Sequence, residues 1–389
     1  MERRTFLKIL SSAGIVSLVS PTFAMEVCKN KVSKSSSALL ESAFRNPPFS
    51  SGVYTWWHWM NGNITKDGIT RDLEAMKANG IAGYQLFEAG SGIPIGPVES
   101  LSDEWVDLIL HTLKESERLG LEFAMHNCPG WSSSGGPWIT PDKAMQIITW
   151  SETKITGGKQ VRIQLPTPKH MFDYYIDTYC LAIPANMKVI PRLSILELSN
   201  RLDKDGVLTW DVPTGEWLIM RFGQTAKDQK NKSAPSKSTG LDCDKFSTEA
   251  LDYHLNCMFK RLMPAMEKIA KHSKIGLLID SYETGDQDWT SDMPAYFEQS
   301  HGYELYPFLP VLANKIVESE ESTKRFLFDF RRVRADMFAE RYYGHFQKRC
   351  KEKGIITYTE PYGGNMMEEL QVAQQLDINM GEFWCGQTV

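Results

Sequence analysis

The sequence lacks the short motifs that mark several common enzyme classes. No Gly-x-Gly-x-x-Gly follows the first predicted strand and no Gly-x4-Gly-Lys-Ser/Thr occurs, so dinucleotide-binding and P-loop folds lose their main support. Neither His-Glu-x-x-His nor Gly-x-Ser-x-Gly is present, which removes the main evidence for a zincin or an α/β-hydrolase. Any catalytic residues must therefore be sought among side chains that lie outside these short motifs.

Cysteine pairs of the metal-binding or redox type are also missing. The 7 cysteines form no Cys-x-x-Cys, which argues against zinc ribbons and thioredoxin-like sites. In an oxidising compartment, an odd number leaves at least one cysteine unpaired. No Leu-x-x-Cys sequence precedes Cys28, so a lipid anchor is not indicated.

The chain has no excess of basic residues. Its formal net charge of -5 gives no electrostatic footprint for nucleic acid, so we expect no nucleic-acid partner. Its 389 residues are enough for one large domain with insertions or for two domains. The 11 tryptophans can fill a core or pack against the C–H faces of sugars, and composition alone favours the core.

The N-terminus predicts an export signal over residues 1–24. Arg3-Arg4 and Phe6-Leu7-Lys8 precede a short apolar run, and small residues end at Ala24. The paired arginines resemble a twin-arginine signal, although Glu2 stands where that signal often has Ser or Thr. We expect a periplasmic or secreted protein with no stable membrane span after signal cleavage; the alternative is an uncleaved anchor. Residues 25–46 predict a flexible lead-in.

Strands and helices then alternate in the pattern of a parallel sheet. Apolar segments 53–60, 81–90 and 121–127 predict strands, and 65–80 and 102–120 predict amphipathic helices. This pattern predicts an α/β fold over 47–389: a (β/α)8 TIM-like barrel. A stretch rich in β-branched and aromatic residues, at about 150–223, predicts an antiparallel β insertion.

Four later segments complete the predicted strands. They are 216–223, as the fourth barrel strand, and then 275–283, 354–363 and 380–384. The count is seven, whereas a closed barrel needs eight. Either one strand is missed, or the barrel is incomplete at its C-terminus and the chain is shorter than the complete protein.

Carboxylates gather where the later strands end. In "LLIDSYETGDQDWT" (277–290), an apolar run leads directly into Asp280 and Glu283, and Glu360 and Glu382 hold similar places. Each of the three glutamates by itself could be a structural ion-pair partner. Because the carboxyl ends of barrel strands meet at one face, we expect the three glutamates to share a cleft. Two carboxylates across a pocket can hydrolyse a glycosidic bond, one as acid and one as base or nucleophile.

Several neighbouring residues are candidates for binding a sugar. His58 is as compatible with a buried structural role as with substrate contact. Asn127, beside His126, offers both a donor and an acceptor to a sugar hydroxyl. The segment 126–141 is either a functional loop or a tight structural one, and Trp131 could line the sugar site. Trp384, the last residue of the final predicted strand, is a further candidate.

Six blocks of the sequence together resemble glycoside hydrolase family 106, the α-L-rhamnosidases. They are "WWHWMNGNITKDGITRDLEAMKANGIAGYQLFE", "MHNCPGWSSSGGPWITPDKAMQ", "GLDCDKFSTEAL", "DSYETGDQDWT", "TEPYGG" and "MGEFW". The resemblance implies a (β/α)8 catalytic domain, an inverting mechanism and a Ca²⁺ ion at the active site. It implies Glu283 as general acid and Glu382 as general base, with Glu360 as a further cleft carboxylate. Family members continue past this chain's last residues, "CGQTV".

The predicted function is removal of terminal α-L-rhamnose from a polysaccharide or glycoside. The three glutamates favour an enzyme. The missing C-terminal part favours an alternative, a catalytically inactive sugar-binding remnant of such an enzyme. A barrel hydrolase that acts on another deoxysugar is a third possibility. We expect a carbohydrate as the binding partner.

Overall fold

The computed structural model describes residues 34–131, 134–383 and 385–386. The chain divides into two compact units, Met1–Val53 and Tyr54–Val389. The predicted export signal lies outside the described residues. Within the described part of the chain, no helix has the length and apolarity needed to cross a bilayer.

The first unit holds a helix where the sequence predicted a flexible lead-in. Helix α3 spans Lys34–Arg45, and the single turn η1 spans Phe49–Ser51. The Arg45 guanidinium lies 3.0 Å from the Glu41 carboxylate, one helical turn earlier. Such a pair supports a helix locally; the helix does not test whether residues 25–46 are a flexible lead-in, which stays a prediction.

The second unit is built on a six-stranded sheet, in the order β1-β2-β3-β13-β15-β16. Neighbouring strands from β2 to β16 pair in parallel, which confirms the predicted parallel sheet. In the described residues the sheet is open, with β1 and β16 at its edges, so closure into a barrel stays a prediction. The strands are β1 (Val53–Met60), β2 (Ile81–Ala89), β3 (Glu122–His126), β13 (Ile275–Ile279), β15 (Ile356–Thr359) and β16 (Ile378–Asn379).

The last strand lies earlier in the sequence than predicted. The structure has β16 at Ile378–Asn379, whereas the aromatic segment 380–384 predicted a strand there. The Met380 N–H still donates to the carbonyl of Thr359, at 2.8 Å, and the ladder ends there. Phe383 is 90% exposed, so its apolar side chain does not pack in the sheet and the prediction was wrong.

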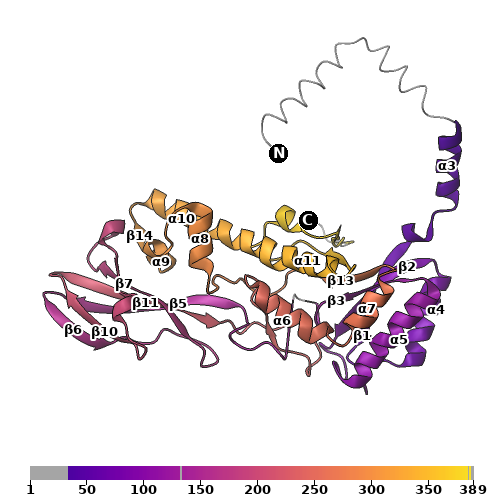
Figure 1. The fold of residues 1–389 in the computed structure, drawn as a ribbon, viewed down its shortest axis with the longest axis horizontal. Coiled ribbons are helices and arrows are strands. Elements are labelled where there is room, and N and C mark those ends of the chain that lie inside the picture. Colours follow the sequence, from indigo (N-terminus) through magenta and orange to yellow (C-terminus); the bar gives the residue numbers. More distant parts are fainter. Residues whose placement is uncertain (1–33, 132–133, 384, 387–389) are drawn as a thin grey trace, which may run out of the picture. The chain divides into compact units, whose positions relative to one another are not determined.

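The two faces of the sheet bury different residues, because successive side chains of a strand point to opposite faces. One face carries a small cluster of Phe87, Ala124, Leu278 and Tyr358. The other face belongs to the main core that includes helices α4 (Lys66–Ala78) and α5 (Asp103–Leu119). Figure 1 shows α4, α5 and α7 beside strands β1 and β3.

The two predicted helices begin and end where their sequence signals stand. The Ser102 hydroxyl accepts a hydrogen bond from the N–H of Trp105, and Gly120 ends α5 in the left-handed conformation. The Thr65 hydroxyl caps α4 in the same way. The remaining helices are α6 (Thr248–Phe259), α7 (Met263–Ile269), α8 (Met293–His301), α9 (Leu309–Leu312), α10 (Glu320–Met337), α11 (His345–Lys351) and α12 (Glu369–Ala373), with the short 3-10 turn η4 (Tyr306–Phe308).

An antiparallel sheet occupies the segment predicted as an insertion. Its order is β5-β11-β7-β9, and a separate ribbon pairs β10 with β6. Strand β11, predicted as the fourth barrel strand, pairs antiparallel with both β5 and β7, so that prediction was wrong. These strands are β5 (Gln146–Thr156), β6 (Lys159–Gln164), β7 (Ile176–Pro184), β9 (Leu196–Glu197), β10 (Val207–Val212) and β11 (Glu216–Ala226).

Short elements complete this region. Turns η2 (Arg192–Ser194) and η3 (Ser199–Arg201) lie between β7 and β10 in sequence. Strand β8 (Val189–Ile190) pairs in parallel with β14 (Ile316–Val317), and β4 (Gly135–Gly136) pairs antiparallel with β12 (Leu241–Asp242). Figure 1 shows the strands of the insertion grouped together, with α9 and β14 above them.

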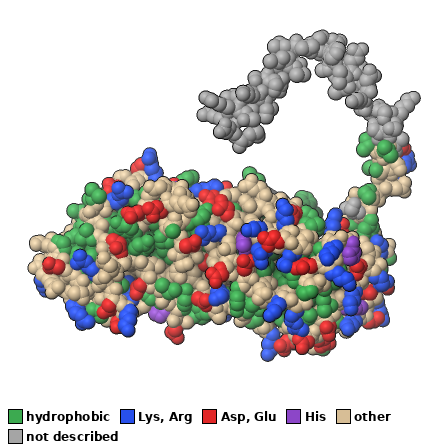
Figure 2. Space-filling model, in the orientation of Figure 1, with side chains coloured by type: hydrophobic (Ala, Val, Ile, Leu, Met, Phe, Trp, Pro, Cys, Tyr) green, Lys and Arg blue, Asp and Glu red, His purple; other side chains and the backbone are tan. Residues whose placement is uncertain are grey.

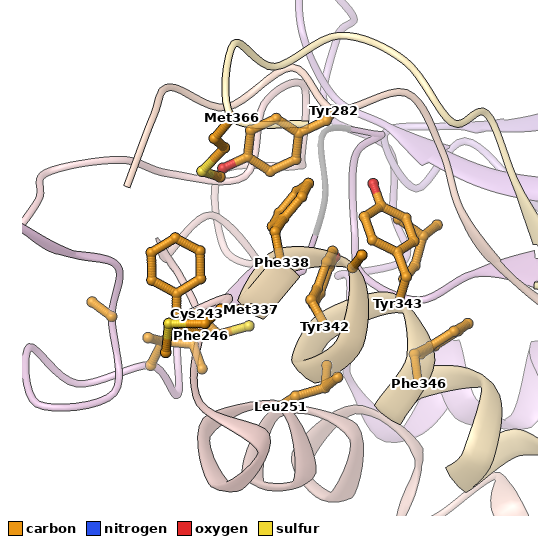
Figure 3. Close-up of a cluster of buried hydrophobic side chains, with 14 of the residues drawn as sticks. Cys243, Phe246, Leu251, Tyr282, Met337, Phe338, Tyr342, Tyr343, Phe346 and Met366 are labelled. Carbon is orange, nitrogen blue, oxygen red and sulfur yellow. The ribbon is translucent and has the colours of Figure 1, made fainter. Parts of the chain in front are cut away.

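A π-helical turn, η5 (Phe338–Gly344), joins α10 to α11 and carries an aromatic cluster (Figure 3). The ring of Phe338 meets that of Tyr282 edge-on, with 4.9 Å between the ring centroids, and stacks with that of Tyr342, with 5.6 Å between the centroids. Tyr343 meets Phe338 edge-on at 5.2 Å. Because Tyr282 directly precedes Glu283, this cluster supports the loop that follows β13.

The surface of the second unit shows no segregation of charge on the face drawn in Figure 2. Acidic and basic side chains are interspersed there, with hydrophobic side chains between them. The second unit also contains ion pairs between exposed side chains: the Arg349 guanidinium lies 2.9 Å from Asp252 and 2.7 Å from Glu352.

The aromatic cluster yields a stability test with an internal control. Phe338 is fully buried, whereas Phe328, on the same continuous helical segment, is 66% exposed. We expect Phe338→Ala to lower the free energy of unfolding by about 3–5 kcal/mol, because it removes a buried ring and leaves a cavity. Phe328→Ala should change it by less than about 0.5 kcal/mol. Urea denaturation of both variants measures this; equal losses would contradict the packing described.

Candidate active site

A cavity of about 290 Å³ lies at the carboxyl ends of the sheet strands. Strands β1 and β2 and the segments that follow β3, β13 and β16 all contribute side chains to it. The lining residues are Trp56, His58, Phe87, Trp131, Asp280, Ser281, Glu283 and Glu382. The structure therefore brings together four of the predicted site residues, at the end of the sheet where the barrel rule places active sites.

A stack of three rings forms one side of this region. His58 stacks on Phe87 and Phe87 stacks on His126, in both cases with 5.4 Å between the ring centroids. His126 is buried on the inner side of Phe87, and burial lowers the pKa of its imidazole to about 4. Burial also lowers the pKa of His58. Both rings are thus favoured in their neutral form near pH 7.

His126 contacts the chain on both of its ring nitrogens and does not line the cavity. Its Nδ1 lies 2.9 Å from the carbonyl of Cys128, and its Nε2 accepts a hydrogen bond from the Asp280 backbone N–H at 3.4 Å. An imidazole protonated on Nδ1 satisfies both contacts. His126 therefore links the end of β3 to the first residue after β13.

Asn127 is also buried away from the cavity wall. Its side-chain N–H donates to the carbonyl of Leu278 at 2.9 Å. Its Oδ1 accepts from the Ser134 hydroxyl at 2.5 Å, and the imidazole of His254 lies 3.1 Å from it. The donor and acceptor that predicted a sugar contact are engaged with the protein, because this amide ties the loop after β3 to β13.

Asp280 is a cavity residue that the sequence analysis did not single out as a site residue. It is the first residue after β13 and is 4% exposed. Its Oδ1 makes no hydrogen bond to any described residue. Burial, and then the charges of Glu360, Glu283 and Glu382, raise its pKa to about 8. The sequence signal that could have identified Asp280 is its position directly after the five-residue apolar strand β13.

The three predicted glutamates lie in two different settings. Glu360, the first residue after β15, is buried and accepts a hydrogen bond from the Tyr362 hydroxyl at 2.7 Å. Burial, followed by the charges of Glu382 and Glu283, raises the pKa of Glu360. Glu283 and Glu382 are exposed on the cavity wall, and the Ser281 hydroxyl lies 3.2 Å from Glu283. Trp384 lies outside the described residues.

The loop that carries Glu283 is held by contacts with distant parts of the chain. The Ile148 N–H of β5 donates to the Asp288 carboxylate at 2.9 Å. The Lys227 ammonium donates to the carbonyl of Asp286 at 2.5 Å. The Tyr282 hydroxyl donates to the carbonyl of Gly285 at 3.0 Å. The antiparallel insertion thus positions the loop from one side, and the aromatic cluster of Figure 3 packs against its start.

A buried ion pair fixes the loop that carries Trp131. Lys245 and Asp242 are both fully buried and in direct contact. The Lys245 ammonium also donates to the carbonyl of Ser134 at 3.1 Å, and the hydroxyls of Ser134 and Tyr342 share a hydrogen bond. Gly130 has φ +84°, and a Cβ there would lie 2.0 Å from the carbonyl oxygen of Lys232. Close backbone packing therefore requires glycine beside Trp131.

The cavity wall combines acids with aromatic rings. Three of its described lining residues are acidic, four are aromatic or imidazole rings, and none is lysine or arginine. Carboxylates accept hydrogen bonds from hydroxyl groups, and aromatic faces pack against C–H groups. This arrangement can bind an uncharged polyol and can place two carboxylates beside it.

The described residues contain no group of three or more His, Cys, Asp or Glu side chains arranged to hold a metal ion. Carboxylate oxygens are the donors that Ca²⁺ prefers, but here they do not converge into such a set. We therefore derive no step through Ca²⁺, which stays a prediction from the resemblance.

Comparisons with known proteins agree with this arrangement. The structure of a rhamnosidase from Novosphingobium sp. PP1Y shares the fold with a TM-score of 0.78, at 24% identity, over 87% of this chain and 49% of that one. A putative beta-glucuronidase from Formosa agariphila is 41% identical over 378 residues, which cover 89% of this chain and 32% of the relative. The chain thus spans about a third of that relative's length. The sequence profile of the family described as alpha-L-rhamnosidase matches residues 45–178 and 169–389, so the chain belongs to glycoside hydrolase family 106.

Proposed function

We propose that this chain carries the catalytic cavity of a glycosidase that removes terminal α-L-rhamnose. The observation that carries the proposal is that Glu283 and Glu382, from two different strand ends, line one cavity with aromatic walls. Membership of the α-L-rhamnosidase family supports the choice of sugar. We also infer that the open sheet is part of a (β/α)8 barrel; the inference is supported by its parallel strands and by the helices α4 and α5 that pack on one face of it.

The two exposed glutamates take the two roles of glycoside hydrolysis. Glu283 is the general acid: it donates a proton to the glycosidic oxygen as the bond to the sugar breaks. Glu382 is the general base: it takes a proton from the water that attacks the anomeric carbon from the opposite face. Such a mechanism inverts the configuration at that carbon. Buried Glu360, held by Tyr362, adds negative charge beside both.

The charge of the cavity favours a neutral sugar over a uronic acid. The name of the relative from Formosa agariphila makes a β-glucuronide the second candidate substrate. A glucuronide would bring a carboxylate into a cavity with three acidic lining residues and no lysine or arginine among those described. The glucuronide carboxylate would find no cationic partner there, and the proposed base, Glu382, carries a charge of the same sign. L-Rhamnose has no charge, and its methyl group suits the aromatic wall.

The catalytic assignment predicts a large loss of activity from two single changes. We expect Glu283→Gln and Glu382→Gln each to lower kcat by about 10²- to 10⁴-fold on an aryl α-L-rhamnoside, because each removes one proton transfer. Glu104→Gln, at an exposed position of α5, is the matched control and should be neutral. Initial rates measure this. If the unaltered chain binds L-rhamnose in calorimetry but never turns over the glycoside, the sugar-binding remnant is the correct description.

The inverting mechanism predicts the anomer that is released first. An α-linked rhamnoside should yield β-L-rhamnose before mutarotation mixes the two forms. Proton NMR spectra taken in the first minutes of the reaction distinguish the two anomers. Initial release of α-L-rhamnose would show retention and would remove the role of base from Glu382.

The acidic cavity should select between two aryl glycosides. We expect kcat/KM on an aryl α-L-rhamnoside to exceed that on the matching β-D-glucuronide by at least about 100-fold, since the latter adds an unpaired charge. Both substrates carry the same aryl leaving group, so the reactivity of the leaving group does not differ between them. Comparable hydrolysis of the glucuronide would show that the cavity accepts an acid and would favour the second candidate.

A further inference from the structure

Among the described carboxyl groups of the cavity region, Asp280 has a distinctive setting. It is 4% exposed, lies on the cavity wall, and its Oδ1 has no hydrogen-bond partner among the described residues. Glu360 is equally buried but is bonded to Tyr362, and Glu283 is exposed to solvent. A buried polar atom without a partner is costly, and Asp280 lines the cavity, so its carboxyl group is placed to gain a partner when the cavity is occupied.

The surroundings of Asp280 disfavour its charged form. Glu360 follows the neighbouring strand in register, because Ile279 of β13 is paired with Thr359 of β15. The Nε2 atom of His126 accepts a hydrogen bond from the Asp280 backbone N–H. Because burial lowers the pKa of His126, its imidazole is neutral and supplies no positive charge. No lysine or arginine is found among the described residues that line the cavity. The titratable groups that face Asp280 are Glu283, Glu360, Glu382, His58, His126, Tyr343 and Tyr362.

We propose that Asp280 is a neutral carboxylic acid that donates a hydrogen bond to a hydroxyl oxygen of the bound sugar. The sugar identity rests on the function proposed above, whereas the protonation state does not. An ionised carboxylate only accepts hydrogen bonds, whereas a protonated one also offers an O–H donor. In the proposed mechanism Glu382, as the base, accepts a proton, and the proton of Glu283 goes to the glycosidic oxygen, so neither donates to a sugar hydroxyl. Asp280 supplies the missing donor, and so acts as a substrate-positioning residue.

The pH dependence follows from this assignment. Burial and the three glutamates raise the pKa of Asp280 to about 8, so the donor is present below that pH and is lost above it. Sugar affinity should therefore fall as the pH rises through about 8. Loss of one neutral hydrogen bond corresponds to a roughly 3- to 10-fold weaker Kd.

The protonation state can be measured without activity. In protein labelled with ¹³C at the aspartate carboxyl carbon, one resonance should titrate near pH 8 and should be absent from Asp280→Asn. Asp252→Asn, at a solvent-accessible position on α6, is the control and should leave that resonance in place. If the resonance lost in Asp280→Asn titrates below pH 6, the neutral acid is overturned.

Calorimetry with L-rhamnose tests the hydrogen bond. The unaltered chain should bind about 3- to 10-fold more weakly at pH 9 than at pH 6. The Kd of Asp280→Asn should not depend on pH, because its amide donates throughout; Asp280→Ala should bind weakly at both values. A wild-type pH profile in Asp280→Asn would overturn the contact. If L-rhamnose does not bind at all, the proposed substrate and this contact both fail, while the titration still decides the protonation state.

Discussion

The parallel register between β13 and its neighbours determines which acids lie at the cavity or beside it. Ile279 of β13 is paired with Thr359 of β15, and Thr359 is paired with Asn379 of β16. The residues that follow these three positions must therefore leave the sheet at one level. Asp280 and Glu360 are those residues on two strands, and Glu382 follows three positions after the third. A slip of one residue would turn the first acids to the opposite face of the sheet.

The strand ends alone would not hold the site, because its catalytic candidates lie on loops. The loop after β13 is fastened to the antiparallel insertion by Asp288 and Lys227, and its start packs on Phe338. The loop after β3 is fastened by the buried pair of Lys245 and Asp242. The insertion and the π-helical turn are thus part of the active-site scaffold, which explains how distant segments of sequence contribute to one cavity.

Local sequence signals predicted the regular elements well but could not decide between similar environments. The sequence of strand β1 indicates a strand and nothing else, and the capping residues of α4 and α5 indicate helices and nothing else. Strand β11 lies between two other strands and is buried from Leu218 to Ala226, and its apolar run over 217–220 looks the same in sequence as that of a parallel barrel strand. The aromatic segment around Phe383 predicted a strand, yet that ring is exposed. Asn127 predicted a sugar contact, but its partners come from β13 and α6, which sequence spacing cannot show.

The central claim is that an uncharged sugar binds between the ring stack and the acids at the ends of these strands. A crystal structure of the chain with L-rhamnose tests it most directly. We expect the sugar in the cavity lined by His58 and Trp131, with its anomeric carbon within reach of both Glu283 and Glu382. Rhamnose bound elsewhere, with this cavity occupied only by water at saturating sugar, would contradict it.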